Sequence, residues 1–135
     1  MMPASEVHSD RLLFVIDFWD VPIEGIATRD GCVIYFRALF DREADEYSGT
    51  YELVPLDDDT AAVAARASEQ SRRFKERRTD SSLAAEHEIR MAELDSAIAR
   101  EMQSRSVLLA NARFVRRSTS KFAEDAFTVT WSDVK

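Results

Sequence analysis

The stretch Leu12–Leu56 reads LLFVIDFWDVPIEGIATRDGCVIYFRALFDREADEYSGTYELVPL, and it decides the fold. Its apolar residues recur at a period of two between turn signals, which is typical of β-strands. Leu12–Phe18 has apolar side chains on both alternating faces, which predicts a strand covered on two sides. Val21 and Pro22 then restrict the backbone and remove an amide donor, so we expect regular pairing to stop near Asp20.

Three more strands are predicted in the same stretch. An Asp-Gly pair at positions 30 and 31 is a turn signal and predicts a hairpin around it. An acidic loop over Asp41–Gly49 precedes the last strand, in which Pro55 marks the strand's end or an edge. The four predicted strands are Leu12–Phe18, Gly25–Thr28, Cys32–Phe40 and Thr50–Leu56.

The hydrophobic period then changes. A run of three aspartates before Thr60 predicts a helix that begins close to Asp59, because carboxylates bind the free amides of a helix start. Thr79–Ser82 is a polar break before a second helix. The core stripe of that helix recurs at steps of three and four residues: Leu83, His87, Met91, Leu94, Ile98 and Met102. Period two returns in Leu108–Val115 and Phe127–Ser132, which predicts a closing antiparallel pair of strands.

Four strands, two helices and two strands in this order predict an α+β fold, an antiparallel sheet with a two-helix hairpin packed on one face. The length of 135 residues fits a single domain over residues 1–135, with residues 1–10 as a loose tail. We find no apolar run of the roughly 20 residues that cross a bilayer and no signal-peptide pattern, so we expect a cytoplasmic protein without a membrane partner.

Charge is divided unequally along the chain. Residues 1–60 contain 14 acidic and 4 basic residues, a net charge of −10, and the remainder carries +3, in agreement with the total of −7. An acidic chain disfavours nucleic acid and favours a basic partner. A basic cluster near residues 72–78 is expected to be a solvated helix face. Cys32 is the sole cysteine, which excludes an intrachain disulfide.

The acidic loop places Asp41, Glu43, Asp45 and Glu52 at positions 1, 3, 5 and 12 of a calcium-loop count. Glu46 stands where the sharp turn of such a loop requires glycine, and strands rather than helices flank it. We therefore expect a solvated acidic loop, without a bound metal or cofactor.

A second acidic group, Asp17, Asp20 and Glu24, could converge with the loop at one end of the sheet and serve acid–base or metal chemistry. Asp17 interrupts an apolar strand, so we expect it to be buried against Arg37, Arg113 or a backbone amide. A structural or partner-binding role is favoured over catalysis, because ion-pair networks often imitate catalytic sites.

Nucleophilic catalysis has little support in the sequence. Cys32 is expected to be a small buried core residue. His87 lies on the apolar stripe and is expected to be packed and satisfied by one hydrogen bond. The three glycines form no phosphate-binding loop, which disfavours nucleotide-dependent enzymes.

One pattern of residues resembles small bacterial proteins of uncharacterised function, and it implies no activity. It consists of Gly25-x-Ala27-x-x-x-Gly31, Tyr35-Phe36, Phe40-Asp41-x-Glu43-x-Asp45-x-Tyr47 and Tyr51-x-Leu53-x-Pro55-Leu56. In size and charge the chain is also similar to the immunity proteins that neutralise a basic toxin, an analogy of general character.

These observations predict a noncatalytic, cytoplasmic interaction module that binds a basic protein through acidic and aromatic side chains. The expected partner-binding residues are Trp19, Asp20, Glu24, Asp41, Glu43, Asp45, Tyr47 and Tyr51. Two alternatives remain open. One is a small metal-dependent or acid–base enzyme that uses the clustered carboxylates, and the other is a self-associating structural protein.

Overall fold

The computed structural model describes residues 9–19, 21–29, 31–76, 81–104, 107–116 and 127–134. Its elements are β1 (Ser9–Trp19), β2 (Val21–Arg29), β3 (Cys32–Asp41), β4 (Glu46–Pro55), α1 (Asp58–Glu76), α2 (Ser81–Ser104), β5 (Leu108–Arg116) and β6 (Phe127–Asp133). The predicted order of strands and helices is confirmed. The chain forms two compact units, one that contains the strands and one that contains α1 and α2.

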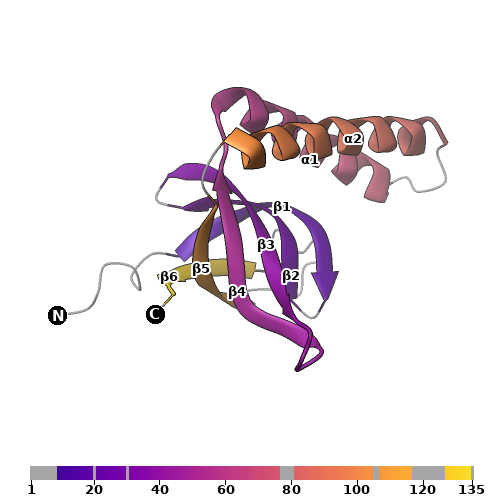
Figure 1. Ribbon diagram of the computed structural model, residues 1–135. Helices are drawn as coiled ribbons and strands as arrows, with labels where there is room; N and C mark the ends of the chain where they lie inside the picture. The colour runs from indigo at the N-terminus through magenta and orange to yellow at the C-terminus, as the bar shows by residue number, and fades with distance from the viewer. Residues whose placement is uncertain are drawn as a thin grey trace. The chain divides into compact units, whose positions relative to one another are not determined.

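The six strands close into an antiparallel barrel in the order β1 to β6 (Figure 1). Closure comes from pairing of β1 with β6, which places Ser9 beside Thr130 and Arg11 beside Thr128. The predicted α+β fold, an antiparallel sheet with a two-helix hairpin packed on one face, is therefore wrong. Period-two patterning specifies strands and their faces, but whether the first and last strands meet depends on twist, stagger and bulges.

Most of the register shifts between the described strands lie in the pairing of β1 with β2. The register of β1 with β2 shifts at three places between Leu12 and Phe18, and such bulges bend a strand and increase its twist. Gly25 lies opposite Val15 in this ladder. A Cβ atom on Gly25 would lie 2.3 Å from the backbone oxygen of Phe14, so only glycine allows the two strands to approach this closely.

The barrel interior is filled by apolar side chains from all six strands. At its centre, aromatic rings from β3, β4, β5 and β6 pack with centroids about 6 Å apart, in tilted and edge-on arrangements that aromatic pairs favour. The buried members of this core are Leu12, Val15, Ile23, Ala27, Ile34, Phe36, Ala38, Tyr51, Leu53, Ala110, Phe127, Val129 and Trp131.

Strand pairing and a hydrogen bond confirm two local predictions. Arg29 pairs with Cys32 across the predicted hairpin turn. Asp57 caps α1, since its Oδ1 accepts the amide of Thr60 at 2.7 Å. The buried carboxylate of Glu101, near the end of α2, accepts the hydroxyl of Thr60 at 3.0 Å and so joins the two helices at this end.

His87 is packed between the two helices, as predicted. Its Nδ1 lies 3.1 Å from Oε1 of Gln70, and its ring stacks on Phe74 with centroids 5.0 Å apart. The Gln70 amide also donates to the backbone oxygen of Leu83 at 2.8 Å. Neither α1 nor α2 is long and apolar enough to cross a membrane.

Two burial predictions are wrong. Cys32 is exposed, because the first residue of a strand, directly after a turn, has few neighbours to cover it. Asp17 is also exposed, and its Oδ1 accepts the amide of Phe18 at 2.9 Å. Asp17 lies between two register shifts of β1, which break the alternation from which its burial was predicted.

Tyr51 provides a test of the barrel interior. Its hydroxyl, on a side chain only 2% exposed, donates to the backbone oxygen of Pro22 at 2.7 Å. Burial raises the pKa of Tyr51 to about 12, above the ordinary value of 10.0. The stabilisation that this shift represents is complete below pH ~10 and is lost as the pH rises toward ~12, because the unfolded chain ionises first.

We expect Tyr51→Phe to lower the free energy of unfolding at pH 8 by about 1 to 2 kcal/mol, since the carbonyl of Pro22 loses its donor. Between pH 10 and 12 the wild type should lose up to roughly 2 to 3 kcal/mol that the variant does not lose. Urea unfolding across this pH range measures both effects. Tyr47→Phe controls for loss of a tyrosine hydroxyl. Parallel pH profiles for wild type and Tyr51→Phe would contradict the assignment.

Candidate functional site

Several exposed apolar side chains lie on strand segments that run to the same end of the barrel. Because neighbouring strands are antiparallel, the β1–β2 and β3–β4 turns lie at the same end as the last residues of β5. We call this end the turn end. Among the described residues of this end, the exposed large apolar ones, each between 36% and 48% exposed, are Phe18, Val21, Phe40, Tyr47 and Val115.

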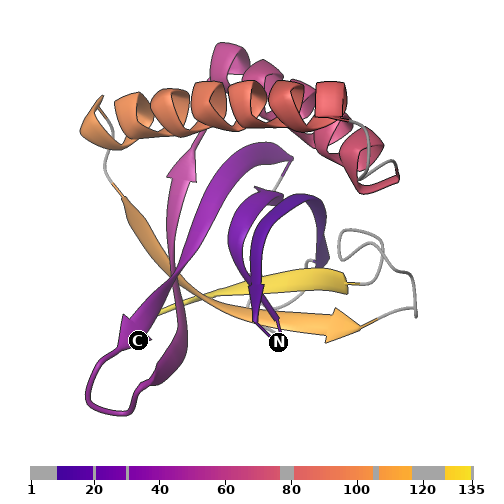
Figure 2. The same ribbon diagram turned by 90° about the vertical axis from the view of Figure 1, so that its right-hand side faces the viewer.

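The β3–β4 hairpin extends the barrel at the turn end. The ladder of β3 with β2 stops at Arg37, and the ladder of β4 with β5 stops at Thr50. The pairing of β3 with β4 continues to Asp41 and Glu46. Residues 38–49 therefore form a two-stranded ribbon, which we call the arm, and Figures 1 and 2 show it projecting past the neighbouring strands.

A bulge bends the arm near its base. Between the pairs Ala38–Tyr51 and Phe40–Tyr47, one residue of β3 opposes three of β4. Gly49, at the centre of these three, has a φ of +82° in the left-handed region that favours glycine. The Ser48 hydroxyl donates to the backbone oxygen of Leu39 and accepts the Thr50 amide, both at 3.2 Å. Such hydrogen-bonded bulges re-aim the side chains beyond them.

The two faces of the arm differ in chemistry beyond this bulge. Phe40 and Tyr47 lie opposite each other, with ring centroids 5.1 Å apart in an edge-on arrangement. Phe40 lies two residues after Ala38 and four after Phe36, so it belongs to the same face of β3 as these core residues. The aromatic pair therefore lies on the extension of the barrel's inner face, beyond the point where the barrel is closed. Asp41 and Glu46 form the next pair and lie on the opposite face.

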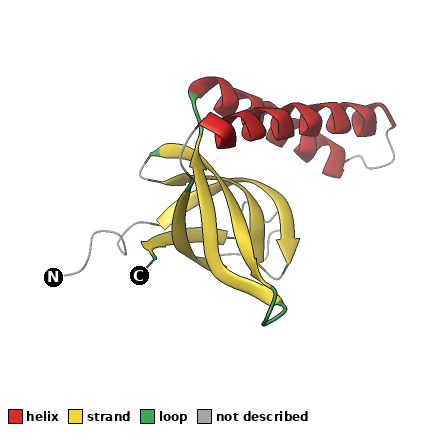
Figure 3. Ribbon diagram, in the orientation of Figure 1, coloured by secondary structure: helices red, strands yellow, loops and turns green. Residues whose placement is uncertain are grey.

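The acidic turn between the strands, green in Figure 3, is held by its own carboxylate. Oδ1 of Asp41 accepts the amides of Glu43 at 3.0 Å and Ala44 at 3.2 Å. Asp45 has a φ of 54°, which aspartate tolerates better than most residues. Among the described residues, the exposed carboxylates of Glu43 and Glu46 have no hydrogen bond or ion pair. Asp41 therefore shapes the turn, whereas Glu43 and Glu46 are available to a partner.

Glu24 and Glu52 lie in a row across the outside of the barrel, on either side of Arg37. Arg37 binds Glu52 at 3.1 Å, and Glu24 accepts a hydrogen bond from the hydroxyl of Tyr35. Burial tends to lower the pKa of Arg37, but the hydrogen bond and charge of Glu52, with the charge of Glu24, raise it overall. These two carboxylates thus have local partners.

The remaining predicted site residues divide between the interior and the arm. Tyr51 lies in the barrel core, away from solvent, whereas Tyr47 is exposed on the arm. The side chain of Trp19, and the whole of Asp20, lie outside the described residues. Within the described part of the chain, no three His, Cys, Asp or Glu side chains are placed to share a metal ion.

Phe40 is the residue that the predicted binding set missed, because the sequence places it at the end of a predicted strand rather than in the acidic loop. The signal in the sequence that could have identified Phe40 is its position relative to Tyr47. Phe40 and Tyr47 flank the run from Asp41 to Glu46, so a hairpin centred on that run brings the two rings together.

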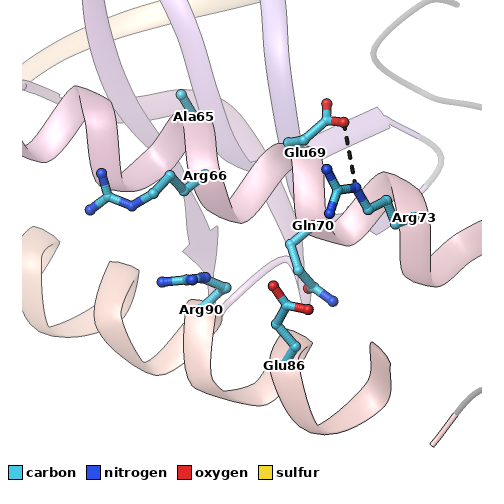
Figure 4. A pocket seen from close by; sticks show the side chains of 7 residues that line it. All are labelled: Ala65, Arg66, Glu69, Gln70, Arg73, Glu86 and Arg90. Carbon is cyan, nitrogen blue, oxygen red and sulfur yellow. Dashed lines mark ion pairs between the residues drawn. The ribbon is translucent and has the colours of Figure 1, made fainter. Parts of the chain in front are cut away.

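A second candidate is a groove of about 330 Å³ between α1 and α2 (Figure 4). Its lining contains three arginines and two glutamates, and Glu69 pairs with Arg73 at 3.7 Å. The Gln70 side-chain amide, which also lines the groove, already donates a hydrogen bond to the backbone oxygen of Leu83. With its charges nearly matched, the groove favours no class of ligand. Its lining residues are Ala65, Arg66, Glu69, Gln70, Arg73, Glu86 and Arg90.

Comparison with known proteins adds no relative from which function could be transferred. No family model, curated protein or solved structure matches this chain. The function of the chain must therefore be inferred from the geometry of the arm and of the turn end.

The roles of the two acidic groups in the turn can be separated. We expect Asp41→Ala to destabilise the arm by about 1 kcal/mol, because two amides lose their acceptor. Hydrogen exchange at the amides of Glu43 and Ala44 should become faster in this variant. Glu43→Ala removes a carboxylate without a described partner and should leave exchange at Ala44 unchanged. Equal effects of the two substitutions would contradict this division of roles.

Proposed function

We propose that this protein is a noncatalytic, cytoplasmic interaction module, immunity-like or regulatory, that binds a basic protein through the arm and the turn end of its barrel. The observation that carries this proposal is the exposed aromatic pair of Phe40 and Tyr47, held beside carboxylates that have no partner among the described residues. An aromatic anchor next to unneutralised charge is the composition of a protein-binding surface.

The aromatic pair supports a binding role because it exposes apolar surface to water, and a partner that covered this surface would be bound favourably. Single exposed apolar residues are normal, whereas Phe40 and Tyr47 are exposed and contact each other, and adjoining exposed apolar side chains are a common mark of interaction sites. Tyrosine and phenylalanine lose little conformational freedom on binding, and rings that already contact each other lose less. We assign the main binding energy to Phe40 and Tyr47.

Electrostatics supports a basic partner. The exposed side chains described at this end include Asp17, Glu43, Asp45 and Glu46, with Arg42 as a countercharge within the turn. Carboxylates at the rim of an interface accelerate encounter with a positive surface and repel acidic proteins. Their contribution is to association rate and selectivity rather than to the stability of the fold.

The alternative of a carboxylate enzyme has no comparable observation in its favour. Glu24 and Glu52 are bound by Tyr35 and Arg37, and Asp41 holds the turn. The carboxylates of Glu24, Glu52 and Asp41 are thus engaged in contacts within the fold. The acids of the arm lie on a projecting ribbon, where we expect a substrate to remain exposed to solvent. Self-association through the arm is also disfavoured, because two acidic arms repel each other.

The test uses a photo-crosslinking phenylalanine analogue in place of Tyr47, introduced in the cells that express the protein. We expect it to capture a basic protein, and the same analogue at Ile89, exposed on α2, to fail to do so. The double substitution Glu43→Lys with Glu46→Lys should slow association with the captured protein by about tenfold or more at low salt and leave the melting temperature nearly unchanged.

The matched control is Glu88→Lys with Asp95→Lys, two exposed acids of α2, which alters the total charge by the same amount. This control should retain most of the association rate, because its charges lie outside the proposed surface. Equal slowing by the two double variants, or equal capture from positions 47 and 89, would rule out the arm as the binding site.

A further inference from the structure

The arm has a strand edge that pairs with no neighbour among the described residues. Each of Ala38, Leu39, Phe40 and Asp41 belongs to β3, yet the ladder of β3 with β2 ends one residue earlier, at Arg37. The other edge of the arm is interrupted by the bulge around Gly49. The edge of β3 is thus the regular one, and it is exposed at Phe40 and Asp41, beside the aromatic pair.

Hydrogen-bonding groups on this edge point outward. The backbone oxygen of Leu39 is directed at β4, where it accepts the hydroxyl of Ser48. Backbone groups of successive residues in a strand point to opposite sides, so the amide and carbonyl of Phe40 face away from β4. An unpaired edge of this kind is a template for a further strand.

From this geometry we infer that the partner binds as an added strand: an extended segment of alternating basic and apolar residues that pairs with β3 beside Phe40. This inference rests on the proposed function and specifies its binding mode. Main-chain hydrogen bonds supply affinity in strand addition, and pockets for alternate side chains supply specificity.

The alternation follows from the two faces of the arm. A residue placed directly opposite Phe40 has its side chain on the face of the aromatic pair, so it should be apolar. The residues before and after it project to the face of Asp41 and Glu46, so they should be lysine or arginine. The same carboxylates repel the arm of a second copy, which selects a basic strand over self-pairing.

The probe is a short synthetic peptide that alternates arginine and valine, and its control is an isomer with the arginines in one block. We expect the alternating peptide to bind the full-length protein about tenfold more tightly than the isomer, by titration calorimetry. Binding should slow hydrogen exchange of the Phe40 amide and should be lost in the Glu43→Lys, Glu46→Lys variant.

N-methylation separates strand pairing from attraction between charges. In the proposed register the valine amides face the arm, so methylation of the valine nitrogens should weaken binding by about tenfold or more, and methylation of the arginine nitrogens should be tolerated. Equal binding by all these peptides would overturn strand addition and leave a basic-partner surface standing. Absence of binding by every peptide would overturn the inference together with the proposed function.

Discussion

The pairing of β1 with β6 is the contact on which the rest of the barrel depends. Only when these strands meet do Phe36, Tyr51 and Trp131, from three different strands, enclose one another instead of facing water. Closure requires the first strand to curve strongly. The register shifts of β1 and the close approach at Gly25 are devices of the kind that curve a strand, and both lie near the start of the chain.

Much of the local structure was predictable because its causes lie within a few residues. The hairpin after Arg29, the cap at Asp57 and the packing of His87 each follow from adjacent sequence. Closure was not predictable in this way, because it joins residues separated by nearly the whole chain. Asp17 shows the limit of alternation: one shift of register moves a side chain from core to solvent without any change in composition.

The candidate site was predicted only in part, because some of its features depend on neighbouring residues and others on contacts formed in the fold. The acidic run could be read directly, since charge density is a local property. The different roles of Asp41 and Glu43 could not be predicted, because they depend on which backbone amides the folded turn places beside the Asp41 carboxylate. Tyr51 and Phe40 have the same inward parity, yet one is buried and the other exposed. Their burial differs because the ladders of β3 with β2 and of β4 with β5 stop between them. The alternation of apolar residues along the sequence does not predict where those ladders stop.

The helical unit has a topological consequence of its own. The chain leaves β4 after Pro55 and returns at Leu108, and Leu53 and Leu108 are partners in the same ladder. In connectivity, α1 and α2 are therefore an insertion within an otherwise simple meander, entered and left at adjacent points. An insertion of this kind can be lengthened, shortened or exchanged over generations without changing strand order, so the two units are free to diverge at different rates.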